Sequence, residues 1–251
     1  MRLLTLAFCS LLLLAGNARP ADIRVFSGGA PQAALRLLAP EFERTSGHRL
    51  DLTFRLVTEI QQKLSAGEKA DVILLPIPLI AATEKSLPFL MGSRMVLARV
   101  GIGVIVRQGA DLPDISSAES VRNLLLAAKG IALSDPGTPT GGHIDRVLEE
   151  VGLAGAVRPK VTTRAAIQGG ADLVAKGEAD IGLYLVSEVQ AAKGVTLVGL
   201  LPAPFQSFVV YGAAVPAGSA APEAALAFIK FISDTTNAAR WRAAGFELAR
   251  E

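Results

Sequence analysis

The residues best suited to chemistry lie in one stretch, residues 131–150, with the sequence IALSDPGTPTGGHIDRVLEE. A short apolar run is followed by a loop rich in Ser, Asp, Pro, Thr and Gly, and then by apolar residues at helical spacing. The first turn of a helix presents unpaired N–H groups and the positive end of its dipole, and glycines let a ligand approach the backbone. The candidate ligand-binding residues of this stretch are Thr138, Thr140, Gly141, Gly142 and His143.

A purely structural interpretation stays open, in which Thr140 caps the helix and the glycines only turn the chain. A second corner of similar composition favours binding, because Ser27, Gly28 and Gly29 also follow a short apolar run and precede a helical pattern. We expect the two corners to face each other across a gap and to hold a negatively charged ligand between their amides.

Further candidates for ligand binding are scattered along the chain: Arg55, Thr58, Arg99, Gln168, Gly169 and Tyr184. Arginine binds carboxylates through two parallel hydrogen bonds, so this set suits a small carboxylate or another oxyanion. In the structural interpretation, Arg55 and Arg99 face water and Tyr184 belongs to the core. The two histidines are far apart and have no carboxylate at metal-ligand spacing, so we expect neither a metal site nor a cofactor.

Composition limits the class of protein. A chain of 251 residues exceeds the usual size of a single core, which predicts two lobes. Hydrophobic residues make up 51% of the chain and aromatic residues only 5%, a composition that suits helices packed on largely parallel sheets. The net charge is +2 without a basic block, so nucleic acid is not an expected partner.

The N-terminus has the pattern of a secretory signal peptide, predicted over residues 1–18. Arg2 is followed by an apolar run, residues 3–15, that is too short to span a bilayer, and then by small residues up to Ala18. We therefore expect cleavage near Ala18 and export to the periplasm. The single cysteine, Cys9, lies in this segment, so the mature chain would contain no thiol.

After the signal peptide, strand and helix patterns alternate, which favours an α/β fold with right-handed crossovers. The expected strands cover residues 23–26, 48–56, 71–75, 160–163, 180–185, 195–198 and 208–215, and residues 95–107 form an extended crossing segment. The expected helices cover residues 32–44, 121–128, 171–175, 221–233 and 238–244, with one more around Ile60 and Leu64 that Thr58 would cap.

Five phrases carry a family resemblance: IRVFSGGAPQAALRLLAPEFERTSGHRLDLTF, GEKADVILLP, VGIGVIVRQGA, SDPGTPTGGH and VAKGEADIGLYLVSEV. In this order they resemble an exported solute-binding protein of the ABC-importer type, and more narrowly the molybdate-binding-protein-like branch. The resemblance implies the type II periplasmic binding protein fold, with a ligand cleft between two lobes that are each a mixed, mostly parallel sheet flanked by helices. Lobe 1 would be discontinuous, residues 22–93 plus 211–251, and lobe 2 would be residues 94–210. It also implies a small anionic ligand and a membrane ABC permease as partners, and we expect a monomer.

The positions that match the molybdate ligands of this branch differ here. Where the molybdate binders have a serine in the first turn, two serines in the second turn and a tyrosine in the cleft, this chain has Ala30, Val57 with Thr58, and Leu185. Because each buried ligand atom left unpaired costs about 1–3 kcal/mol, these differences disfavour molybdate. We expect a binding protein for a small carboxylate or another oxyanion, with no catalytic residue.

One alternative is an enzyme. Some chains that resemble this branch are periplasmic isomerases of unsaturated tricarboxylates such as aconitate, which work by proton transfer. In that case His143 or Tyr184 would be the base.

Overall fold

The structure is a computed structural model, and it describes residues 19–249. The predicted signal peptide, including Cys9, lies outside the described residues. None of the helices within residues 19–249 is both long enough and apolar enough to span a bilayer.

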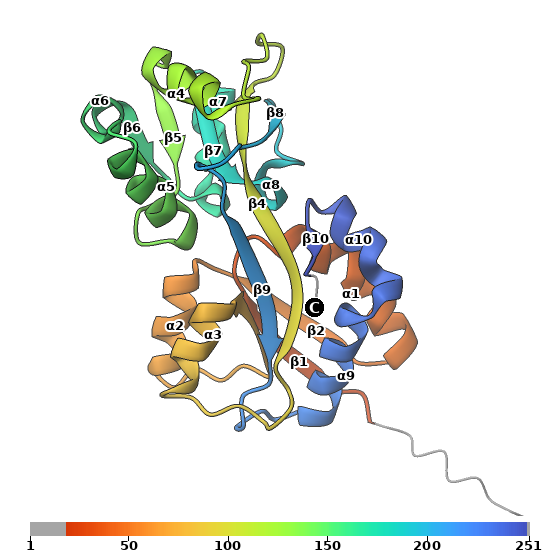
Figure 1. Ribbon diagram of the computed structural model, residues 1–251. Helices are drawn as coiled ribbons and strands as arrows, with labels where there is room; N and C mark the ends of the chain where they lie inside the picture. Colours follow the sequence, from red (N-terminus) through yellow and green to blue (C-terminus); the bar gives the residue numbers. More distant parts are fainter. Residues whose placement is uncertain (1–18, 250–251) are drawn as a thin grey trace, which may run out of the picture.

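The chain alternates strands and helices, as the sequence predicts (Figure 1). The elements up to the long strand β4 are β1 (Asp22–Ser27), α1 (Gln32–Ser46), β2 (Arg49–Phe54), α2 (Val57–Ser65), β3 (Val72–Pro76), α3 (Ile77–Glu84) and β4 (Met95–Arg107). The middle elements are α4 (Ala118–Ala127), β5 (Ile131–Leu133), α5 (Pro139–Glu150), α6 (Ala154–Val157), η1 (Arg158–Lys160), β6 (Val161–Thr163), η2 (Ala166–Gln168), α7 (Gly170–Ala175), β7 (Ile181–Leu185), α8 (Val186–Val189) and β8 (Val195–Leu200). The chain ends with β9 (Phe208–Ala214), α9 (Pro222–Ser233), η3 (Thr235–Asn237), α10 (Ala238–Ala243) and β10 (Glu247–Leu248).

One mixed sheet runs through the molecule, with the strand order β2-β1-β3-β9-β4-β7-β5-β6. The strands β1, β2 and β3 are parallel to one another, as are β5, β6 and β7, whereas β4 and β9 run antiparallel to their neighbours. Residues 95–101 of β4 pair with β9, and residues 102–107 pair with β7 and β8. Figure 1 shows β4 and β9 running between two groups of helices and strands, which confirms the predicted two-lobe α/β fold. The exact lobe boundaries stay a prediction.

The long strand β4 confirms the predicted crossing segment, and its glycines have a packing role. A Cβ on Gly101 would lie 2.8 Å from a side-chain carbon of Leu200, and a Cβ on Gly103 would lie equally close to Leu197. Both glycines therefore let β4 approach its neighbours closely instead of interrupting the strand.

The helix α3 was not predicted, and one local expectation was wrong. This helix follows β3 directly and has Pro78 in its first turn, where the missing N–H of proline costs nothing. Thr58 does not cap α2, since the helix begins at Val57 and has no side-chain cap.

The C-terminal segment packs back on the N-terminal elements. Trp241 of α10 is buried, donates a hydrogen bond to the Ile232 carbonyl at 2.8 Å, and meets the ring of Phe246 edge-on at 5.1 Å. Arg240 pairs with Glu41 of α1. The first and last parts of the described chain therefore share one core.

Asp71 ties this C-terminal return to the central strands. It is buried, and its carboxylate accepts hydrogen bonds from the Arg24 N–H at 2.9 Å, the Ser219 hydroxyl at 2.8 Å and the Ala220 N–H at 2.7 Å. Burial alone would raise the pKa of Asp71, but these hydrogen bonds hold the pKa below its ordinary value. The ionised carboxylate thus joins β1 and β3 to the segment that leads into α9.

Candidate functional site

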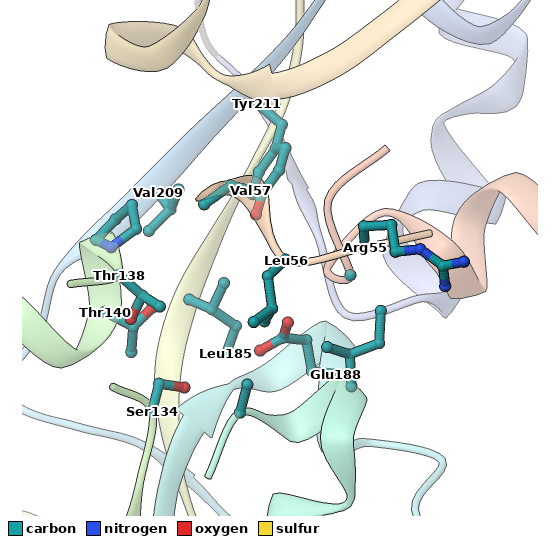
Figure 2. Close-up of a pocket in the computed structure, with 14 residues that line it drawn as sticks. Arg55, Leu56, Val57, Ser134, Thr138, Thr140, Leu185, Glu188, Val209 and Tyr211 are labelled. Carbon is teal, nitrogen blue, oxygen red and sulfur yellow. The ribbon is translucent and has the colours of Figure 1, made fainter. Parts of the chain in front are cut away.

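The loops that follow β1, β2, β5, β6 and β7 converge with strand β9 on a cavity of about 40 Å³ (Figure 2). Ligand sites of open α/β sheets lie outside the carboxyl ends of the strands, and all five loops leave such ends. The lining residues are Gly29, Arg55, Leu56, Val57, Ser134, Thr138, Pro139, Thr140, Ala165, Ile167, Leu185, Glu188, Val209 and Tyr211. The two corners singled out in the sequence, after β1 and before α5, therefore do face the same space.

The corner before α5 uses most of its polar groups internally. The Thr138 hydroxyl accepts a hydrogen bond from the Gly141 N–H at 3.1 Å and donates one to the Asp135 carbonyl at 2.7 Å. The Gly142 N–H donates to the Thr138 carbonyl at 2.9 Å. Thr138 is therefore the N-cap, and the alternative in which Thr140 caps the helix is wrong.

Thr140, Thr138 and Ser134 bring three hydroxyl groups to one side of the cavity (Figure 2). Gly141 and Gly142 do not line it. A Cβ on Gly141 would lie 2.1 Å from the Asp135 carbonyl oxygen, so this glycine lets the preceding loop fold tightly onto the first turn of α5. The role of the two glycines in ligand binding stays a prediction.

The corner after β1 reaches the cavity through Gly29. Ser27 is buried, and its hydroxyl donates to the Gly28 carbonyl at 2.9 Å. The Gly28 N–H donates to the Leu74 carbonyl at 3.1 Å, and a Cβ on Gly28 would lie 3.0 Å from Val57. Ser27 and Gly28 therefore do not line the cavity, and their hydrogen bonds hold the loop after β1 in place.

The three candidates Arg55, Thr58 and Arg99 take different positions. Arg55 lines the cavity but is exposed, and its guanidinium extends away from the hydroxyl groups (Figure 2). Thr58 is exposed and lies outside the lining. Arg99 pairs with Glu247 at 2.7 Å and stacks over the Phe208 ring at 4.4 Å, which gives it a structural role at the edge of β4.

The remaining sequence candidates lie outside the cavity lining. His143 is half-buried, with its Nε2 atom 3.1 Å from the Phe205 carbonyl oxygen. Tyr184 is buried and donates to the Arg164 carbonyl at 3.0 Å. Gln168 and Gly169 follow the lining residue Ile167 but do not line the cavity themselves.

Glu188, which the sequence reading overlooked, is the main titratable group of the cavity wall. It lies in α8, directly after the buried strand β7, and its carboxyl group points toward Leu56 and Leu185 (Figure 2). In residues 19–249 it has neither a hydrogen-bond partner nor an ion-pair partner in the protein. Burial raises the pKa of Glu188 from 4.5 to about 7.

Tyr211 of β9 is a second lining residue that was missed. It is buried, and its hydroxyl points into the cavity (Figure 2). Burial, and then the nearby carboxyl of Glu188, raise the pKa of Tyr211, so its hydroxyl stays a hydrogen-bond donor at neutral pH. Only Glu188 carried a signal in the sequence, because an acidic residue just after a buried strand sits where ligands bind.

Two lobes connected by long strands, with a cavity lined from both, define a two-lobe binding protein. The chain belongs to the family of bacterial extracellular solute-binding proteins, whose sequence profile matches residues 23–247. This match confirms the resemblance inferred from the sequence.

Individual relatives agree with that family. The chain is 32% identical to aconitate isomerase of Pseudomonas sp. over 242 residues, which cover 92% of this chain and 91% of that protein. It is 25% identical to the molybdate-binding protein ModA of Escherichia coli (strain K12) over 216 residues, 82% of each chain. The structure of the periplasmic molybdate-binding protein of Azotobacter vinelandii superposes with a TM-score of 0.76 at 20% identity, covering 91% of this chain and 100% of that one.

Proposed function

We propose that this chain is a periplasmic binding protein that captures a small organic carboxylate in the cavity and delivers it to a membrane ABC permease. Glu188 is the observation that carries the proposal. A carboxyl with a pKa of about 7 and no protein partner is about half protonated at neutral pH and largely protonated below it, and in its protonated form it can donate a hydrogen bond to a ligand carboxylate. The hydroxyls of Tyr211, Thr140 and Ser134 supply further donors.

The apolar part of the cavity wall favours an organic ligand over molybdate. Val57 and Leu185 line the cavity at two of the positions where the resemblance to the molybdate-binding-protein-like branch implies hydroxyl groups, and Leu56, Ile167 and Val209 add further apolar surface. A tetrahedral oxyanion would leave oxygen atoms unpaired against these side chains, at about 1–3 kcal/mol each. The carbon atoms of an organic acid can contact the same side chains without that cost.

The cavity must enlarge to admit such a ligand. A cavity of about 40 Å³ has room for only a few water molecules, because each needs roughly 10–15 Å³ of cavity volume. An organic acid of several carbon atoms needs more room, so binding requires separation of the lobes or movement of lining side chains. Domain closure around a ligand is a known motion of periplasmic binding proteins.

Calorimetric titration with molybdate, tungstate, sulfate, citrate and aconitate tests the proposal. We expect binding of the carboxylates and none of the metal-oxide anions. Above about pH 7 the carboxylate affinity should fall, because ionised Glu188 loses its proton to donate and repels the ligand. Binding of molybdate or tungstate alone would overturn the carboxylate proposal.

Isomerisation of an unsaturated tricarboxylate is the second candidate function, and Glu188 is again the observation that favours it. A general base works best when its pKa lies near the working pH, and the pKa of about 7 meets this condition. The relative named aconitate isomerase gives the substrate to test. Glu188 would take a proton from the methylene carbon beside the double bond, the double bond would shift, and the same proton would return to the far end of the allylic system.

Ultraviolet absorbance of cis- and trans-aconitate separates the two candidates. If the chain is an isomerase, Glu188→Gln should abolish turnover and retain most binding, whereas Glu150→Gln, on the exposed end of α5, should leave both unchanged. His143→Ala should reduce turnover less than Glu188→Gln, because the imidazole contacts the Phe205 carbonyl outside the lining. Absence of turnover above background in the unaltered protein ends the isomerase candidate and leaves the binding proposal standing.

A further inference from the structure

A second hollow adjoins the cavity, on the other side of Gly29, Ile167 and Glu188. It has a volume of about 480 Å³, and its walls come from α1, from η2 and from α8 with the residues after it. The three residues line both spaces, so they form the partition between the small inner cavity and this larger outer hollow.

The partition is thin and depends on a glycine. A Cβ on Gly29 would lie 3.0 Å from a carboxyl oxygen of Glu188 and 3.3 Å from side-chain carbons of Ile167. Only a residue without a side chain lets these two groups close against the backbone at this point. Glu188 has no hydrogen bond or ion pair to hold it among the described residues, so its side chain can rotate away from the partition.

The hollow contains a positive charge that lacks an ion-pair partner. Ser187 also lines the hollow, but its hydroxyl oxygen is enclosed by the protein and has no hydrogen-bond partner within residues 19–249, so it is not one of the groups that face the hollow. Arg36 of α1 brings a positive charge to the same hollow; its guanidinium lies 5.9 Å from the centre of the Phe54 ring and forms no ion pair in the described part of the chain.

We propose that the inner cavity and the hollow form one ligand site, in which the cavity holds one carboxylate and Arg36 holds another, so that the ligand is a di- or tricarboxylate. This inference rests on the proposed binding of a carboxylate. Arg36 is exposed, so its guanidinium is accessible to a ligand in the hollow and can supply a charge-assisted hydrogen bond. The ligand passes between Gly29 and a displaced Glu188.

The test compares a long and a short probe by calorimetric titration, with ligand-observed NMR for a probe that binds too weakly for calorimetry. Propane-1,2,3-tricarboxylate has no double bond and cannot be isomerised, and butanoate carries a single carboxylate. Arg36→Gln should weaken tricarboxylate binding about tenfold and change butanoate binding less than twofold. Arg44→Gln, which removes the same charge from the last turn of the same helix, should change neither.

A steric variant makes the test independent of charge. Ala191 lines the hollow and is exposed, so Ala191→Phe fills the space without disturbing the core. This variant should also weaken tricarboxylate binding more than butanoate binding. The two-part site would be overturned if Arg36→Gln, Arg44→Gln and Ala191→Phe bound the tricarboxylate equally well. It would also be overturned if Arg36→Gln lost the same affinity for both probes. In either case the proposal that the protein binds a carboxylate would stand. If the unaltered protein binds neither probe, both proposals fail.

Discussion

Replacing Glu188 with glutamine removes a half-buried carboxyl with a pKa near neutral pH, and the change should alter the free energy of unfolding. The pKa rises from 4.5 to about 7 on folding because burial disfavours the charged form. At 1.36 kcal/mol for each pKa unit, this corresponds to about 3 kcal/mol. Since Glu188 is only half-buried by its accessible surface, water screens part of this energy and the figure is an upper limit.

The direction follows from proton linkage. A raised pKa in the folded state means that folding favours the protonated carboxyl over the ionised one. The stability that depends on this proton is fully present below about pH 4.5 and is lost as the pH rises through about 7. The free energy of unfolding of the unaltered protein should therefore fall by up to about 3 kcal/mol between about pH 5 and pH 8, relative to Glu188→Gln.

Urea denaturation followed by circular dichroism at several pH values in this range measures the difference. Glu150→Gln, at an exposed position on α5, is the matched control and should follow the unaltered protein. Parallel stability curves for the unaltered protein and Glu188→Gln would refute the reasoning. They would mean that water reaches the carboxyl freely, and the protonated donor on which the proposed function rests would not exist at neutral pH.

Two further comparisons test how α5 is positioned. Thr138→Ala should lower the free energy of unfolding by about 1 kcal/mol through loss of the helix cap, and it should also weaken ligand binding. Ser117→Ala removes the corresponding cap of α4, so it should cost similar stability and leave ligand binding unchanged. Urea denaturation measures the stability of both variants, and calorimetry measures their ligand binding. Gly141→Ala should destabilise the chain by about 1–3 kcal/mol because its Cβ would meet the Asp135 carbonyl. The same change at Gly155, where a Cβ meets nothing within 4 Å, should be neutral or stabilise by up to about 1 kcal/mol, and a destabilisation as large as that of Gly141→Ala would contradict the steric argument.

Local patterns in the sequence were enough to predict the class of fold. Strands such as β5 and β7 are short apolar runs because helices cover the sheet, and α5 was predicted because Ile144, Val147 and Leu148 recur at helical spacing. All three are buried in the structure. Such patterns also placed two polar corners at the carboxyl ends of strands, where a cavity was then found.

The direction of individual side chains was decided by tertiary structure. Arg99 was a plausible ligand group until β10 brought Glu247, which is 148 residues away in sequence, beside its guanidinium. His143 likewise turns its imidazole to the carbonyl of Phe205, which is 62 residues away. Neither contact has a local signature in the sequence.

The sequence by itself determined where most strands and helices lie, because their patterns depend on residues close together in the chain. Only the tertiary structure decided that Glu188 and Tyr211 share a cavity with Thr140, since their three segments meet solely through the pairing of strands from both lobes. The raised pKa of Glu188 also depends on the tertiary structure, because burial by segments distant in the sequence disfavours the charged carboxylate.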